Sequence, residues 1–401
     1  MKFSFSKTLR RVTRAASAGS ATRAMQRAIG GAMARTVAAT MSKLSAAPPA
    51  RTKPAKAPRK AASKPARKRA ATTGTPGSRS LGVVLSQLRI AKAMMPVAFR
   101  LSVPSATPAP SGPPALPKGA RFEQRSYSGA AGSRDFKLFL PAVRSGGPKG
   151  LIVMLHGCTQ DPDDFATGTN MNAMAQKHGL AVAYPAQTRG HNASACWNWF
   201  SPANQARGKG EPAVIAGLAR RVMQEFGLER DRVFVAGLSA GGAMAVIVAE
   251  TYPDVFSAAG VHSGLARGSA TTLMSALSAM RSGAPAARTP ATRRKGAAPA
   301  ARRIVFHGDA DSTVHPSNAA QVVAGAVGAR EPARVIPKSA AGRDYVRSDY
   351  VLPDGTVDVE WWQIKGAGHA WSGGQPGGSY ADPTGPDASA EMVRFFLAKA
   401  E

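Results

Sequence analysis

One stretch of the chain, residues 233–248, constrains the fold more than any other. It opens with an apolar run at 233–236 that predicts a buried strand, and it ends in an alanine-rich segment that predicts a helix. Between the two stands Gly-Leu-Ser-Ala-Gly, which matches the pattern G-x-S-x-G. A strand, a tight turn and a helix in this order hold a serine in strained backbone at the carboxyl edge of a sheet. We therefore predict that Ser239 is a nucleophile and not a chance serine in a glycine-rich turn.

The segments on either side of this turn alternate between strand and helix patterns. Residues 121–128 and 134–141 predict a hairpin. Later apolar runs predict buried strands at 150–156, 180–184, 231–236, 256–262, 302–306 and 357–364. Helical patterns fall at 171–178, 211–226 and 388–398, and residues 283–301 predict a surface insertion. This alternation predicts an α/β fold with a mostly parallel sheet and helices on both faces, within a domain of residues 120–401.

Most of the positive charge lies ahead of that domain. The chain has 401 residues and a formal net charge of +30, and residues 1–122 contain 24 Lys and Arg and no acidic residue. Residues 47–79 contain almost no large apolar side chain, which predicts disorder. Apolar side chains recur every three or four positions at 25–44 and again at 81–101, which predicts short amphipathic helices. A proline-rich linker at 102–119 completes a largely disordered basic extension, residues 1–119.

This extension suggests a role in localisation, with three alternatives left open. A basic amphipathic helix can lie on an anionic or apolar surface. A basic tail can bind a polyanion, including nucleic acid, in a salt-dependent way. The helix can also be a loose alanine-rich segment that has no partner. Arginines interrupt the only window for a secretory signal, so we expect no ordinary signal peptide. No apolar stretch approaches the ~18 residues of a membrane span.

A nucleophilic serine needs a base, an acid that orients the base, and donors for the oxyanion. In this type of fold the chain order is serine, then acid, then histidine. Asp309 and Asp311 both follow the strand at 302–306, and either could instead be a turn residue. We choose Asp311 as the acid, because Asp309 is better placed to hold the turn. His369 stands between small residues after the last strand and is the predicted base, and the weaker candidates are His156, His262, His307 and His315.

The loop after the strand at 150–156 has the sequence His-Gly-Cys-Thr-Gln and should supply one oxyanion N–H, while Ala240 supplies the other. The segment Cys-Trp-Asn-Trp-Phe at 196–200 either packs in the core or forms an aromatic wall for an apolar or sugar-like ester, with Trp197 and Trp199 as its members. Two cysteines cannot make a disulfide framework, but Cys196 could bridge to Cys158 and brace the oxyanion loop. We find no Cys/His metal spacing and no phosphate loop, so we expect neither a metal nor a cofactor.

Taken together, these pieces resemble the poly(3-hydroxybutyrate) depolymerase family of esterases, which is close to the feruloyl and acetylxylan esterases of the α/β-hydrolase group. The matching motifs lie at 125–129, 155–160, 196–200, 237–242, 307–311 and 368–374. The resemblance implies an α/β-hydrolase fold, a triad of Ser239, Asp311 and His369, an oxyanion contribution from Cys158, and Trp371 near the substrate. It also implies an extracellular enzyme, whereas the basic extension favours a cytoplasmic, granule-associated one.

The sequence thus predicts a serine esterase that acts through an acyl-enzyme on hydroxyalkanoate oligomers or polymers. Within the same fold, the alternatives are a feruloyl or acetylxylan esterase and a serine peptidase. From another class, the alternative is a granule- or nucleic-acid-binding protein with a vestigial hydrolase domain. Because the serine, the acid, the histidine and the oxyanion loop are all present, we favour an enzyme.

Overall fold

The computed structural model describes residues 114, 116–143, 145–283 and 298–398. The helices predicted near 25–44 and 81–101, the basic segment at 47–79 and most of the insertion predicted at 283–301 lie outside the described residues. Within the described ranges, every helix is too short or too polar to span a membrane.

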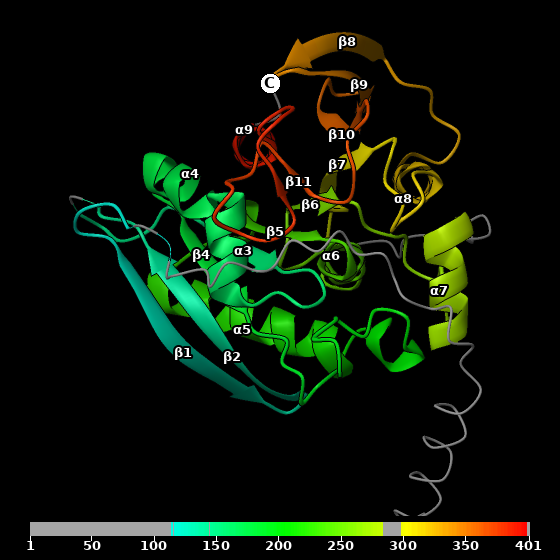
Figure 1. The fold of residues 1–401 in the computed structure, drawn as a ribbon. Coiled ribbons are helices and arrows are strands. Elements are labelled where there is room, and N and C mark those ends of the chain that lie inside the picture. The colour runs from blue at the N-terminus through cyan, green and yellow to red at the C-terminus, as the bar shows by residue number, and fades with distance from the viewer. Residues whose placement is uncertain (1–113, 115, 144, 284–297, 399–401) are drawn as a thin grey trace, which may run out of the picture. The chain divides into compact units, whose positions relative to one another are not determined.

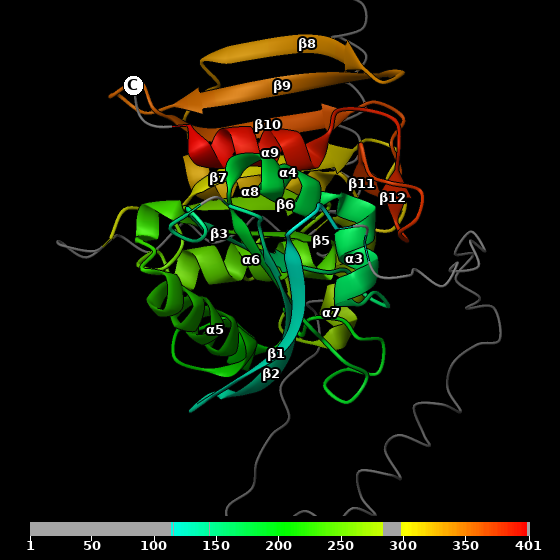
Figure 2. The ribbon, with the colours of Figure 1, turned by 90° about the vertical axis from the view of Figure 1, so that its left-hand side faces the viewer.

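Ten strands of the described chain form one sheet in the order β1-β2-β4-β3-β5-β6-β7-β10-β9-β8. The central strands, all parallel, are β4 (Ala181–Pro185), β3 (Leu151–Leu155), β5 (Val233–Leu238), β6 (Ala258–His262), β7 (Arg302–Gly308) and β10 (Val357–Ile364). Antiparallel strands extend both ends: β1 (Arg121–Gly129) with β2 (Gly132–Leu140), and β9 (Arg343–Val351) with β8 (Arg334–Ala340). Figures 1 and 2 show these two ribbons at opposite ends of the sheet. The mostly parallel sheet is confirmed, and β8 and β9 are additions that the sequence did not predict.

Helices cover both faces of the sheet, as the alternating pattern predicted. One face is covered by α5 (Gly210–Phe226), α6 (Ala240–Thr251) and α8 (Ser317–Val327), and the other by α3 (Pro162–Thr169), α4 (Met171–His178) and α9 (Ala388–Leu397). Successive side chains of a strand point to opposite faces. Leu151 and Val153 of β3 therefore join the core under α5 and α6, while Ile152 and Met154 join the core under α4 and α9.

The remaining elements are short. They are the 3-10 turns Pro202–Asn204 and Arg230–Arg232, the helix α7 (Leu273–Ser282), which packs near α8, and a two-stranded parallel sheet of β11 (Trp371–Ser372) and β12 (Ala381–Asp382). Because β3, β5, β6, β7 and β10 are parallel, the loops that follow them meet at one edge of the sheet. The five loops begin at residues 156, 239, 263, 309 and 365, and the predicted catalytic residues all lie in or beside them.

Candidate active site

Ser239 occupies a strained turn between β5 and α6. Its backbone angles are φ 57° and ψ −119°, in a region that L residues rarely adopt and that structures retain mostly at functional sites. Its N–H donates to His262 O at 2.9 Å, and its carbonyl accepts the N–H of Ala243 at 2.9 Å. A Cβ atom added to Gly241 would lie 2.0 Å from Leu155 O, so α6 begins closer to β3 than any larger residue permits. This is the geometry of a nucleophile elbow.

Asp311 and His369 are in direct contact. His369 Nδ1 lies 2.8 Å from Asp311 Oδ2, and because a carboxylate only accepts, Nδ1 carries the proton and Nε2 is left as an acceptor. The other carboxylate oxygen, Oδ1, accepts the N–H groups of Thr313 at 2.9 Å and Val314 at 2.8 Å. The Asp311 carboxylate is buried and fixed on both oxygens, as an orienting acid requires.

The neighbouring aspartate has a different role. Asp309 is exposed, and its Oδ1 accepts the N–H of Gly366 at 2.6 Å. That bond ties the loop after β7 to the loop after β10. Asp309 therefore holds the turn, which is the part the sequence suggested for it.

Within the described residues, Ser239 Oγ makes no hydrogen bond, so the structure joins the acid to the base but does not join the base to the serine. Contacts of this kind are often long before substrate binds and tighten only in the Michaelis complex. The order of the loops along the sheet edge still puts Ser239 after β5, Asp311 after β7 and His369 after β10.

A second histidine contacts the acid. His307 Nε2 donates to Val314 O at 2.8 Å and lies 3.3 Å from Asp311 Oδ2. Burial alone would raise the pKa of Asp311, but hydrogen bonds from His307 and His369 outweigh it, so that the pKa lies well below its ordinary value. The Asp311 carboxylate is therefore ionised near neutral pH. The sequence analysis weighed His307 only as a weak candidate base, and its place at the head of the 307–311 motif was the signal for this second role.

His262 links the turn that carries Ser239 to the segment that follows His369. Its carbonyl accepts the Ser239 N–H, and its ring Nε2 accepts the N–H of Ser372 at 3.1 Å. The ring stacks against both Phe306 and Trp371. Burial, together with the neighbouring His307 and His369, lowers the pKa of His262 to about 3, so the ring is neutral near pH 7. Apart from a histidine at the end of a buried strand, no sequence pattern indicated this role.

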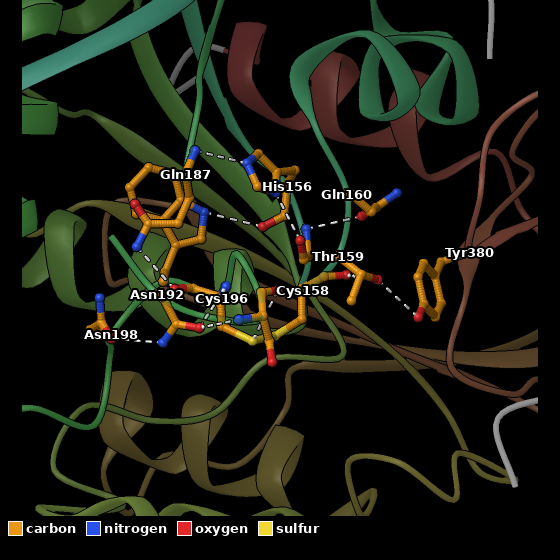
Figure 3. The surroundings of a disulfide bond; sticks show 12 residues. His156, Cys158, Thr159, Gln160, Gln187, Asn192, Cys196, Asn198 and Tyr380 are labelled. Atoms are coloured by element: carbon orange, nitrogen blue, oxygen red, sulfur yellow. Dashed lines mark hydrogen bonds between the residues drawn. A yellow bond between two sulfur atoms is a disulfide. The ribbon is translucent and has the colours of Figure 1, made fainter. Parts of the chain in front are cut away.

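The oxyanion loop, residues 156–160, follows β3 (Figure 3). The N–H groups on either side of Cys158 are already occupied: Gly157 donates to Gln160 Oε1 at 2.9 Å, and Thr159 donates to Ser194 O at 2.8 Å. Between them, the N–H of Cys158 has no hydrogen-bond partner in the described part of the chain. Ala240, the first residue of α6, has no acceptor for its N–H within the helix. These are the two N–H groups that the sequence analysis assigned to the oxyanion.

A disulfide joins Cys158 to Cys196 with an S–S distance of 2.05 Å, and it connects the oxyanion loop to the loop ahead of α5 (Figure 3). Hydrogen bonds reinforce the connection. Trp197 Nε1 donates to His156 O at 3.1 Å, and the N–H of Gln187 donates to His156 Nε2 at 3.0 Å. The disulfide and these two hydrogen bonds therefore fix the start of the oxyanion loop.

The three tryptophans proposed for substrate contact lie in the interior. Trp197 is 0 %, Trp199 4 % and Trp371 1 % exposed, so none presents a face to a ligand. Trp371 Nε1 donates to Ser389 Oγ at 3.1 Å, and its ring backs His262. Core packing therefore replaces both the aromatic wall predicted for Trp197 and Trp199 and the substrate contact implied for Trp371.

Residues 134–330 match the family model described as Esterase PHB depolymerase. The chain carries an esterase domain of this family. The matched segment contains Ser239 and Asp311, whereas His369 lies beyond it.

Curated relatives of the esterase domain fall in the same group. The chain is 33% identical to poly(3-hydroxyalkanoate) depolymerase C of Paucimonas lemoignei over 227 residues. This aligned region covers 55% of this chain and 54% of the relative. It is 30% identical to probable acetylxylan esterase A of Aspergillus clavatus, over 45% of this chain and 61% of the relative. A feruloyl esterase B of Neurospora crassa is 33% identical over 29% of this chain and 39% of its own length. The match thus spans about half the length of these relatives.

Among solved structures, an acetyl xylan esterase from Aspergillus awamori superposes with a TM-score of 0.55 at 21% identity, covering 69% of this chain and 98% of that one. At this level of sequence identity, the similarity is evidence for the fold alone. The α/β-hydrolase fold expected for the esterase domain is confirmed by it.

Sequence reasoning missed a polar network that braces the oxyanion loop. Gln160 Nε2 donates to Asp164 Oδ2 at 2.9 Å and to Ser379 O at 3.1 Å, and Ser379 N–H donates to Asp164 Oδ1 at 2.7 Å. Gln160 thereby fixes Gly157, and it links the loop to a segment more than two hundred residues later in the chain. Gln160 could have been noticed as part of the 155–160 motif. Its partner Ser379, however, lies in a glycine-rich stretch that has neither a helix nor a strand pattern.

Reduction of the disulfide should lower both the stability and the activity of the esterase domain. The bridge closes a loop with a sequence separation of 38 residues, which on the chain-entropy model contributes about 3–4 kcal/mol to the free energy of unfolding. Because Cys158 also supplies a candidate oxyanion N–H, we expect the melting temperature and the rate of ester hydrolysis to fall together in reductant.

The matched variant is Cys196→Ser, which breaks the bridge without changing Cys158. It should reproduce the effect of reductant and should respond no further when reductant is added. Mass spectrometry of the unreduced protein that found two free thiols would contradict this prediction.

Proposed function

We propose that the esterase domain is a serine esterase in which Ser239 is the nucleophile, His369 the general base and Asp311 the acid that orients it. The observation that carries this proposal is the combination of the strained Ser239 turn with the 2.8 Å Asp311–His369 contact at the same edge of the sheet. With Nδ1 held by Asp311, the lone pair of His369 Nε2 is free to accept the serine proton.

The proposed reaction proceeds in two stages. Ser239 Oγ attacks the ester carbonyl carbon as His369 takes its proton, and the carbonyl oxygen gains negative charge. In this proposal the N–H groups of Cys158 and Ala240 donate to that oxygen, and loss of one such donor typically costs ~10²–10³ in rate. His369 then gives the proton to the leaving alkoxide, and an acyl-enzyme remains. Water activated by His369 releases the acid and restores Ser239.

For the substrate, we propose an ester of a hydroxyalkanoate oligomer or polymer. The name of the Paucimonas lemoignei relative supports this class. The names of the acetylxylan and feruloyl esterase relatives support a second candidate, a carbohydrate ester. The test is a panel of purified-protein assays on hydroxybutyrate oligomers, feruloyl esters and acetylated xylan. A kcat/KM highest for acetylated xylan would replace the first candidate with the second.

For the location, we propose an oxidising compartment, and hence export. Disulfides persist in extracellular and periplasmic proteins and are rare in the cytosol. The Cys158–Cys196 bond is the supporting observation. A cytoplasmic enzyme on polyester granules is the alternative that the basic extension suggests.

For residues 1–119, we propose a localising role without chemistry, because every proposed catalytic residue lies after them. Deleting them should leave hydrolysis of a soluble short-chain ester unchanged and should abolish co-sedimentation with polyester granules. Sedimentation of the full chain should persist at high salt, because apolar burial by an amphipathic helix does not depend on counterion release. Sedimentation that disappears in salt would favour a plain polyanion-binding tail.

A further inference from the structure

The loop that follows β10 and carries His369, residues 365–370, is here called the base loop. Residues 373–382 come shortly after it and lie against α3 and the oxyanion loop, and we name them the strap. The N–H of Gln375 donates to Gly168 O at 2.8 Å, and Ser379 is bonded to Asp164 and Gln160 as described above. At its far end, β12 pairs with β11 directly after the base loop. The strap is therefore a fixed part of the esterase domain that rests on both the base loop and the oxyanion loop.

Tyr380 is a strap residue that contacts both of these loops. Its hydroxyl lies 3.3 Å from Thr159 Oγ1, and Figure 3 shows the phenol pointing to Thr159 on the side away from the disulfide. Its ring centroid lies 6.4 Å from that of His369, with the two planes 79° apart. Its carbonyl accepts the N–H of Trp371 at 2.7 Å, which fixes the backbone behind the ring. A half-buried phenol thus stands between the base and the oxyanion loop.

The hydrogen-bond pattern shows that the phenol proton is only loosely held. Thr159 Oγ1 donates its single proton to Cys158 O at 2.6 Å, so in the contact with Tyr380 the threonine oxygen accepts. A separation of 3.3 Å is long for O–H···O, for which about 2.5–3.0 Å is usual. Thr159 is exposed, and both residues have left-handed backbones, with φ 64° and φ 51°. For a β-branched and an aromatic residue this conformation is unfavourable, and structures keep it mostly where function requires it.

We infer that Tyr380 is a substrate-positioning residue whose hydroxyl donates to an oxygen on the leaving group of the ester. This inference rests on the proposed function. His369 must reach the leaving oxygen to protonate it, so the group beside His369 is the leaving alcohol. In a hydroxyalkanoate oligomer that alcohol carries the next ester carbonyl or the terminal carboxylate, both good acceptors. A simple alcohol carries neither, so Tyr380 favours oligoester bonds over simple esters.

The test compares two esters with the same acyl group, the linear dimer of 3-hydroxybutyrate and ethyl 3-hydroxybutyrate. Only the dimer has an acceptor on its leaving group. In Tyr380→Phe, the ratio of kcat/KM for the dimer to kcat/KM for the ethyl ester should fall about tenfold, the effect of one lost hydrogen bond to a charged or carbonyl oxygen. In Thr159→Val, which removes the competing acceptor, the ratio should stay at or above the wild-type value.

A matched control is Tyr350→Phe, a buried tyrosine on β9, which should leave the ratio as in wild type. If Tyr380 only braces the strap, Tyr380→Phe lowers both kcat/KM values and the melting temperature in parallel and the ratio does not move, which overturns the inference. A wild-type protein that hydrolyses neither ester would instead show that the proposed function is wrong, so the two failures are distinguished.

Discussion

Replacing Ser239 with alanine is expected to abolish ester hydrolysis, with turnover falling by about 10⁴–10⁶-fold. The variant should fold normally for a physical reason. Alanine has the same Cβ as serine, so the strain at φ 57° is no greater, and the Ser239 backbone bonds to His262 and Ala243 do not involve the side chain. Purified protein assayed on a soluble short-chain ester gives the rate, and thermal unfolding gives the stability.

A serine far from the site provides the matched control. Ser257 lies at the opposite edge of the sheet, just before β6, and its Oγ bonds only to backbone carbonyls. Ser257→Ala should keep wild-type activity, and a fluorophosphonate probe should label it but not Ser239→Ala. If Ser239→Ala retained more than a few per cent of wild-type turnover, the nucleophile would have to be sought elsewhere. Failure of the probe to label the wild type would favour a vestigial hydrolase domain.

The central sheet could be predicted from sequence because its strands are buried on both faces. Residues of β3 and β5 form continuous apolar runs, which are typical of parallel strands that are buried on both faces. β8 could not be found in this way. It is an edge strand with most of its side chains exposed, and Pro337 sits in its middle. It has neither an apolar run nor an alternating pattern, and only its pairing with β9 makes it a strand.

For the site, local sequence indicated candidate catalytic residues but not which side chains are exposed. Ser239, Asp311 and His369 were assigned from the loops that follow predicted strands, since parallel strands put those loops at one edge. Trp197 and Trp371 could not be assigned correctly, because whether an indole lines a pocket or fills the core depends on packing from distant elements. The contact of Tyr380 with Thr159 joins residues 221 positions apart, and no local pattern records such a contact.

Asp311→Asn is expected to reduce turnover by about 10⁴-fold with a much smaller effect on the fold. The amide oxygen can still accept the N–H groups of Thr313 and Val314, but the amide NH₂ then faces His369 Nδ1 and His307 Nε2. Two donors cannot bond to each other, so His369 must shift its proton to Nε2. In that tautomer it cannot accept the proton of Ser239. The rate on a short-chain ester, measured alongside the melting temperature, separates this effect from unfolding.

Asp309→Asn provides the matched comparison, because the same substitution is made two residues away. Asp309 uses one oxygen to accept the N–H of Gly366, and an asparagine oxygen can make that bond equally well. Its side chain is exposed, so the loss of charge costs little. We therefore expect Asp309→Asn to keep most of the wild-type turnover while Asp311→Asn loses nearly all of it. The reverse ranking would make Asp309 the orienting acid, and the Asp311–His369 contact would then be structural only.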